Sequence, residues 1–252
     1  MAKISDVNAI QVFDSRGVPT ISCKITLDNG ISASSMVPSG ASTGSKEALE
    51  LRDNEDGYHG KGVLKAVTNI KNKLKPLILG LNPANQLEID QILIDFDGTK
   101  DKSKIGANSI LAISLAISHA AAKDQNIDLH EHFLDLYKNI TGDSIKPSIP
   151  IPMFNILNGG EHANNNIDIQ EFMIIPKGAK DFKQAMRWSS EVYWSLKTIL
   201  KEQSLSSAVG DEGGFAPNLK SNEEAIKLIL EAIKKSDLEP GKDIFLALDC
   251  AA

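Results

Sequence analysis

The chain has 252 residues, 42% hydrophobic and 24% charged, and 27 basic against 33 acidic residues give a formal net charge of −6. These proportions are typical of a folded globular protein, and the acidic balance argues against a dedicated nucleic-acid binder. No apolar run reaches the roughly 18 residues of a membrane-spanning helix, and the start of the chain lacks the pattern of a secretory signal. With only two cysteines, Cys23 and Cys250, we expect two buried thiols in a reducing compartment rather than a disulfide framework.

The first part of the chain is predicted to form an antiparallel sheet. Apolar and polar residues alternate over residues 20–27, which indicates a strand with one solvent-exposed face. Asp28-Asn29-Gly30 follows, and Asn-Gly is a strong hairpin signal, so residues 31–37 are expected to return as a second strand. Residues 4–13 are expected to supply a third strand.

Helical periodicity follows the strands. Apolar residues recur at a period near 3.6 over residues 62–74, and Pro76 is expected to end this helix. The remaining predicted helices cover residues 84–96, 107–123 and 130–140. The middle one is apolar nearly all round and is therefore expected to be buried. Strands followed by helices indicate an α+β domain over residues 1–140.

A proline-rich segment with Pro147, Pro150 and Pro152 then favours extended backbone. Beyond it, strands are predicted over residues 152–157, 169–175 and 244–248, and helices over residues 181–203 and 223–235. Strands separated by helices predict a parallel sheet or a barrel. The last strand is apolar at every position, which is typical of a strand buried on both faces.

The loop at residues 38–46 is the first candidate for a functional role. It is not a phosphate-binding P-loop, because only three residues separate Gly40 from Gly44 and Ser45 intervenes before Lys46. Two interpretations remain open. The loop is either a turn of small residues or a mobile lid whose hydroxyls and amides reach an anion or a metal.

Four further segments, at predicted strand ends and in a glycine-rich loop, contain candidate functional residues. The candidates are His162 within residues 158–166, Gln170 and Glu171 at the start of a strand, Glu212 within GDEGGFAP, and Asp249 at the end of the last strand. Barrel enzymes place catalytic groups at the carboxyl ends of strands. The plainer alternatives are a surface loop, a strand-edge charge, an acidic turn and a helix N-cap.

Long motifs in these regions carry a family resemblance. They are VFDSRGVPT (12–20), VPSGASTGSKEALELRD (37–53), IPMFNILNGGEHANNN (151–166), QEFMIIP (170–176), GDEGGFAP (210–217) and ALD (247–249). Together and in this order they resemble the enolases over the whole chain, and the NGGEHA block is more similar to bacterial members. The resemblance implies an α+β capping domain over residues 1–140, followed over residues 141–252 by the first part of a modified α/β (TIM-type) barrel.

The resemblance also implies a reaction, the reversible dehydration of 2-phosphoglycerate to phosphoenolpyruvate in glycolysis and gluconeogenesis. Glu212 would be the general acid, assisted by Glu171. Hydroxide leaves poorly and must be protonated as it departs, and two carboxylates close together raise the pKa of one of them. The enolate formed next to a carboxylate needs strong stabilisation, which Mg²⁺ supplies.

By the same resemblance, Gln170 and His162 would bind substrate, and Asp249 and Ser42 would bind Mg²⁺. The expected partners are the small-molecule substrate and further copies of the chain in a homodimer or larger homo-oligomer, without nucleic acid or a membrane span. The implied location is the cytoplasm, with secondary display on a bacterial cell surface suggested by the family alone.

The chain is too short for the whole implied enzyme. A closed α/β barrel takes about 250 residues, whereas about 110 follow the proline-rich segment. The lysine base, two further acidic metal ligands and other substrate-binding residues of the family would come later. We therefore expect this stretch to be the N-terminal part of an enolase and to be inactive alone. The alternatives are an inactive fragment or binding scaffold with an enolase-like surface, and another activity of the enolase superfamily.

Overall fold

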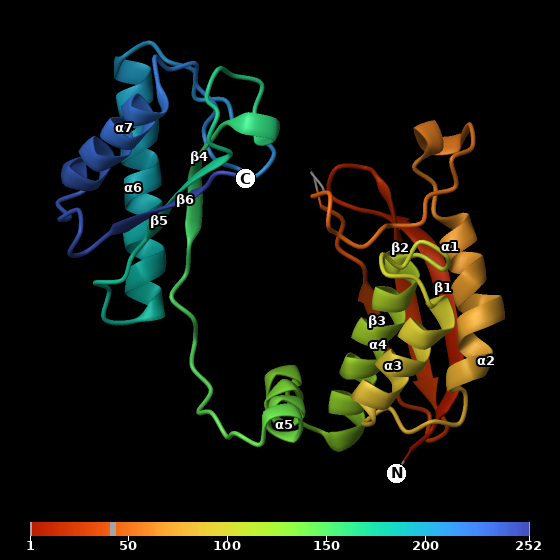
Figure 1. Cartoon of the computed structure of the whole chain (residues 1–252). Helices are drawn as coiled ribbons and strands as arrows, with labels where there is room; N and C mark the ends of the chain where they lie inside the picture. Colours follow the sequence, from red (N-terminus) through yellow and green to blue (C-terminus); the bar gives the residue numbers. More distant parts are fainter. Residues whose placement is uncertain (1, 41–43, 252) are drawn as a thin grey trace. The chain divides into compact units, whose positions relative to one another are not determined.

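The computed structural model describes residues 2–40 and 44–251 (Figure 1). The chain divides into two compact units, Met1–Pro147 and Ser148–Ala252. Residues 143–153, which contain the three prolines of the proline-rich segment, form neither helix nor strand and are largely exposed. None of the helices in the described residues is long and apolar enough to span a membrane.

The first unit opens with the predicted antiparallel sheet, in the order β1 (Ile4–Phe13), β2 (Pro19–Leu27) and β3 (Ser32–Met36). Along β2 the alternate residues Ile21, Cys23, Ile25 and Leu27 are buried, so the strand has the expected apolar face. Gly30, with φ of +86°, forms the predicted hairpin turn between β2 and β3.

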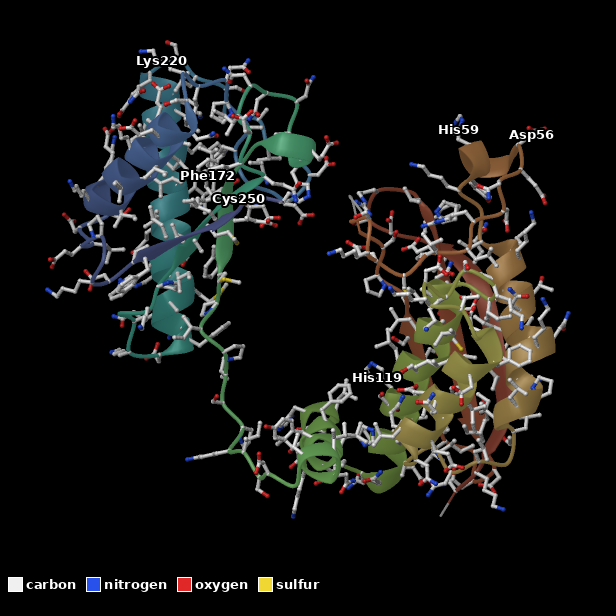
Figure 2. The ribbon with its side chains drawn as sticks, viewed as in Figure 1. Asp56, His59, His119, Phe172, Lys220 and Cys250 are labelled. Carbon is white, nitrogen blue, oxygen red and sulfur yellow. The ribbon has the colours of Figure 1, made fainter. Side chains whose placement is uncertain are left out.

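The helices of the first unit are α1 (Leu64–Asn69), α2 (Lys75–Ile78), α3 (Gln86–Asp97), α4 (Ala107–Gln125) and α5 (Leu129–Thr141). A short 3₁₀ turn, η1 (Gly57–Gly60), precedes them. Helices α1, α2 and α4 pack on the sheet, whereas α3 and α5 pack on α4. Helix α4 contacts β2 and β3, and Ile113 and Ile117 lie fully buried in the core between them. The prediction that this helix is buried is confirmed on that side, although Leu111 is exposed, and so is His119, which Figure 2 labels.

The prediction that Pro76 ends the first helix is wrong. A π-helical turn, η2 (Ile70–Leu74), connects α1 to α2, which carries Pro76 in its first turn. A proline inside a helical path removes one backbone hydrogen bond and needs room for its ring, and the preceding π turn is a local irregularity at that point. The wider π turn lets the amide of Lys75 donate to the carbonyl of Ile70, so the helical path continues to Ile78.

The second unit contains β4 (Phe154–Asn158), η3 (Gly160–His162), β5 (Glu171–Ile175), α6 (Phe182–Glu202), α7 (Asn222–Lys235) and β6 (Phe245–Asp249). The strands lie in the order β4-β5-β6. Both pairs are antiparallel, so the expectation of a parallel sheet is wrong for these three strands. A loop without a long crossover helix joins β4 to β5. Two successive helices join β5 to β6, whereas a single crossover helix would return the next strand parallel, and β6 pairs antiparallel to β5.

Helices α6 and α7 pack together and against the sheet of the second unit. Phe172 and Ile174 of β5 point into the core they share, as Figure 2 shows for Phe172. Each helix begins at a polar cap: Asp181 accepts from the amide of Gln184 at 2.7 Å, and Ser221 accepts from that of Glu224 at 3.2 Å. The three strands form an open sheet, and the described residues contain no closed barrel.

Strand β6 was expected to be buried on both faces, and that expectation is wrong. It is an edge strand that pairs only with β5 among the described residues, and Leu248 is 43% exposed. The same edge position explains the exposed thiol of Cys250, labelled in Figure 2, where the sequence predicts a buried one. Cys23 is buried as expected, and burial raises the pKa of its thiol to about 12. Both cysteines are free.

A buried carboxylate holds the start of α1 in the first unit. The N-cap residue of α1 is Val63, whose side chain cannot accept a hydrogen bond. The carboxylate of Asp53 takes over this capping role: it accepts from the amides of Leu64 at 2.9 Å and Lys65 at 2.8 Å. Replacing Asp53 by Ala should lower the free energy of unfolding of the first unit by about 1–2 kcal/mol, because two helix-end donors lose their acceptor.

Asp56 is the matched control, since it is exposed and its side chain makes no cap hydrogen bond. The Asp56→Ala variant should stay within about 0.5 kcal/mol of the parent. Denaturant unfolding with hydrogen exchange at the α1 amides measures both variants. Equal stability of the two variants would contradict this role for Asp53.

Candidate functional site

The predicted site residues of the second unit meet at one edge of its sheet. Glu171 opens β5, and its backbone pairs with Asn158 at the end of β4 and with Asp249 at the end of β6. Residues directly opposite on paired strands have neighbouring side chains. The antiparallel order therefore brings Glu171 and Asp249 side by side although 78 positions separate them in the sequence.

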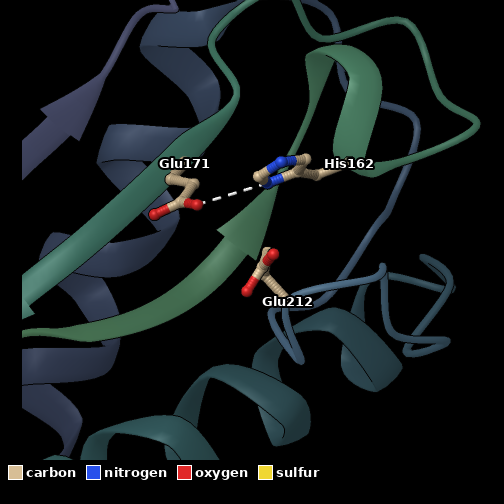
Figure 3. Close-up of side chains that lie close together, drawn as sticks. All are labelled: His162, Glu171 and Glu212. Carbon is tan, nitrogen blue, oxygen red and sulfur yellow. Dashed lines mark ion pairs between the residues drawn. The ribbon is translucent and has the colours of Figure 1, made fainter. Parts of the chain in front are cut away.

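His162 and Glu212 approach this edge from two loops (Figure 3). His162 ends η3, and its Nδ1 lies 3.2 Å from Oε1 of Glu171, with the two side chains only 7% and 19% exposed. Glu212 comes from the glycine-rich loop between α6 and α7. Ligand atoms of His162, Glu171 and Glu212 all lie within 4.8 Å of one another. One imidazole and two carboxylates therefore share a small space.

The surroundings of Glu171 favour its protonated form. Burial raises the pKa of its carboxyl most strongly, the neighbouring His162 opposes that rise, and the negative charges of Asp249 and Glu212 add to it. Among the described residues, no lysine or arginine forms an ion pair with any of these three acids. A carboxyl whose pKa is raised in this way is better suited to hold and pass on a proton than an ordinary glutamate.

Close backbone packing fixes the loop that carries Glu212. The amide of Asp211 donates to the carbonyl of His162 at 3.0 Å, so the two loops are bonded directly beside the site. A Cβ at Gly210 would lie 2.4 Å from that carbonyl oxygen, closer than side chains are found. Gly210 and Gly214 thus allow close approach of backbone, whereas Gly213 has open space around it and a φ of +81°.

Phe215 anchors the other end of this loop in the core. Its amide donates to the carbonyl of Ile156 at 3.0 Å, and its carbonyl accepts from the amide of Asn158 at 2.9 Å, so it lies beside β4 like an added strand residue. Its ring is 1% exposed and stacks on Tyr193 of α6, with 4.3 Å between ring centres. The hydroxyl of Tyr193 donates to the carbonyl of Gly213 at 3.0 Å, which ties the loop to α6.

Asparagines hold the loop that carries His162. Asn165 donates through Nδ2 to the carbonyls of Asn158 at 2.9 Å and Pro217 at 3.1 Å, and Asn166 exchanges two hydrogen bonds with the backbone of Leu219. Sequence reasoning did not single out these supporting residues. The run of asparagines after GGEHA was the available signal, because side-chain amides satisfy loop backbone where strands and helices do not.

The remaining predicted site residues are placed as follows. The carboxylate of Asp249 accepts from the amide of Ala251 at 2.9 Å through Oδ1. Gln170 is 7% exposed, and its backbone amide donates to the backbone carbonyl of Asp249 at 3.0 Å. Ser42 lies outside the described residues. The structure thus brings Glu171, Glu212, His162, Gln170 and Asp249 to one edge of a single sheet.

The close packing around Gly214 gives a first test of how the glycine-rich loop packs against β4. A Cβ there would lie 2.6 Å from Oδ1 of Asn158 and 2.8 Å from the amide of Leu157. Gly214→Ala should lower the free energy of unfolding of the second unit by about 1–3 kcal/mol through overpacking. Urea unfolding followed by tryptophan fluorescence reports this unit directly, because both tryptophans, Trp188 and Trp194, lie in α6.

Gly241→Asn is the control for Gly214→Ala. Gly241 has φ of +81° with open space around it, and asparagine is among the residues that tolerate this conformation best. A loss of stability in Gly214→Ala no larger than that in Gly241→Asn would contradict the packing argument.

The raised pKa of Glu171 predicts a pH-dependent effect of Glu171→Gln. Because the folded pKa lies above the unfolded one, folding favours the protonated acid, and the wild type loses stability as the pH rises through the folded pKa. The uncharged glutamine avoids that loss. Glu171→Gln should therefore be more stable than the wild type at about pH 7, and the difference should vanish near pH 4, below the usual pKa of glutamate.

Tryptophan-monitored urea unfolding between about pH 4 and 8 measures this difference. Glu231→Gln, at an exposed position of α7, should show no such pH dependence. A Glu171→Gln variant less stable than the wild type by the same amount at every pH would contradict the electrostatic argument.

Comparison with protein families accounts for nearly the whole chain. The family described as "Enolase, N-terminal domain" matches residues 4–133, and the one described as "Enolase, C-terminal TIM barrel domain" matches residues 146–252. The two matches follow each other in the order of the two structural units. The first covers more than half of the chain by itself. The chain belongs to the enolase family.

Proposed function

We propose that this chain provides the capping domain and the first part of the barrel of an enolase, which interconverts 2-phosphoglycerate and phosphoenolpyruvate with loss of water. The observation that carries the proposal is the convergence of Glu171 and Glu212 with His162 beside Asp249 in a member of this family. The domain ranges proposed are residues 1–140 and 141–252.

The proposed roles follow from the demands of the reaction. The departing hydroxyl needs a proton, and we assign Glu212 as the general acid that supplies it, with Glu171 assisting. The exposed position of Glu212 on its loop leaves it accessible to a substrate, whereas the raised pKa of the neighbouring Glu171 favours a shared proton between the two acids. Gln170 and His162 are proposed to contact the substrate from the buried side of the site.

The residues present also fit the proposed Mg²⁺. Asp249 offers carboxylate oxygen, the donor that hard divalent cations prefer, at an edge where three carboxylates lack a lysine or arginine ion pair among the described residues. Ser42 is the second proposed ligand. A bound Mg²⁺ would stabilise the negative charge that develops when the proton next to the substrate carboxylate is removed.

The family resemblance also implies residues beyond the chain, a place in metabolism, a location and an oligomeric state, and these form part of the proposal. The lysine base and the remaining acidic ligands of the family have no counterpart assigned within these 252 residues, so the chain alone is proposed to be inactive. Placement in glycolysis and gluconeogenesis follows from the proposed reaction. The cytoplasmic location and the homo-oligomeric state rest on the resemblance alone. The alternative is a fragment or binding scaffold that keeps an enolase-like surface without turnover.

A turnover assay separates these alternatives. The 252-residue chain and the polypeptide encoded by any continuing reading frame of its gene are each given 2-phosphoglycerate and Mg²⁺, and phosphoenolpyruvate is measured. We expect turnover only from the longer polypeptide. Full turnover by the 252-residue chain would contradict the proposed division of the site, and a stop codon after Ala252 would favour the scaffold.

In the longer polypeptide, Glu212→Gln should lower kcat by about 10²- to 10⁴-fold, the usual contribution of a general acid. Glu231→Gln on the exposed face of α7 is the control and should leave kcat unchanged. Wild-type kcat in Glu212→Gln would remove Glu212 from the proposed role.

A further inference from the structure

The Nδ1 atom of His162 lacks a hydrogen-bond partner. It is buried, and no described residue accepts from it or donates to it in hydrogen-bond geometry. Its near neighbour is Oε1 of Glu171 at 3.2 Å, the ion-pair contact that the dashed line in Figure 3 marks. Buried polar atoms normally have a hydrogen-bond partner, so a buried ring nitrogen that meets a carboxylate outside hydrogen-bond geometry leaves its lone pair open to a cation bound between them.

The spacing of the three side chains suits a small cation. Their ligand atoms lie within 4.8 Å of one another, and zinc bonds to histidine nitrogen and carboxylate oxygen are about 2.0–2.2 Å long. A cation between them requires a modest approach of the donors. Glu212 can supply it by rotation of its side chain, because that side chain is exposed.

The donor set selects the kind of cation. One imidazole nitrogen with two carboxylate oxygens suits borderline ions such as Zn²⁺, whereas Mg²⁺ prefers oxygen alone. We propose that His162, Glu171 and Glu212 form a binding site for Zn²⁺ or a similar transition-metal ion, separate from the Mg²⁺ position proposed at Asp249. The two carboxylates supply negative charge that no lysine or arginine ion pair neutralises in the described part of the chain.

A consequence for catalysis rests on the proposed function. A cation bound to Glu171 and Glu212 occupies the carboxylate oxygens that would hold the proton for the leaving hydroxyl. Zn²⁺ at this site would therefore inhibit the dehydration even when Mg²⁺ is in its own place. The binding itself depends only on the three side chains and can be measured on the 252-residue chain.

Titration of the untagged 252-residue chain with Zn²⁺ at about pH 7, by calorimetry, tests the site. We expect one saturable site that survives millimolar Mg²⁺. His162→Gln and Glu212→Gln should each weaken it by at least about tenfold, since loss of even an outer contact to a metal ligand costs that much. Glu212 is exposed, so Glu212→Gln keeps the test valid if His162→Gln fails to fold.

Two control variants remove other metal-binding side chains. His119→Gln and Cys250→Ser change an exposed histidine and the exposed thiol, and neither should alter the affinity for Zn²⁺. Co²⁺ in place of Zn²⁺ should give a visible spectrum without a thiolate charge-transfer band, and the spectrum should change in His162→Gln.

The site is refuted if Zn²⁺ binds His162→Gln and Glu212→Gln as tightly as the parent, if Cys250→Ser abolishes binding, or if no saturable binding occurs. None of these results affects the turnover assay, which uses 2-phosphoglycerate and Mg²⁺ in the longer polypeptide. Conversely, a chain without enolase turnover still binds Zn²⁺ here if the inference is correct.

Discussion

The contact between Gly210 and the carbonyl of His162 determines where Glu212 lies. Any side chain at position 210 would collide with that carbonyl, and the adjacent amide of Asp211 donates to it. This contact joins two loops that come from different parts of the chain. Glu212 therefore reaches His162 and Glu171 because backbone meets backbone without an intervening Cβ, and the rest of the site depends on that approach.

The fold maintains this arrangement against its own electrostatics. Burial and two neighbouring acids make the charged form of Glu171 unfavourable, so the cluster lowers the stability of the second unit near neutral pH. Residues around it compensate: Phe215 fills the core, Tyr193 holds the carbonyl of Gly213, and Asn165 bonds two loop carbonyls. Stabilised surroundings with an unfavourable centre are typical of functional sites.

Sequence patterns with a local physical cause predicted the structure well. The alternation of residues 20–27 and the Asn29-Gly30 turn predicted the first sheet, and helical periodicity predicted α6 and α7 to within a residue or two of their ends. Pairing between distant segments was harder to predict. The antiparallel direction of β5 and β6 depends on two helices packing as one layer, and the exposure of Cys250 depends on the edge position of β6. Neither the strand direction nor the exposure of Cys250 can be predicted from the residues of the strand alone.

The candidate site likewise combines residues that local sequence patterns indicate with a spatial arrangement that they do not. The acids were visible in the sequence as charges at strand ends and between glycines, whereas their convergence required the register that sets Glu171 opposite Asp249. The central claim is that these acids share one electrostatic environment. Carboxyl carbon NMR of Glu171 as a function of pH tests it most directly. The account predicts a raised pKa that falls toward the ordinary value in Glu212→Gln, and an unshifted pKa that ignores this substitution would contradict it.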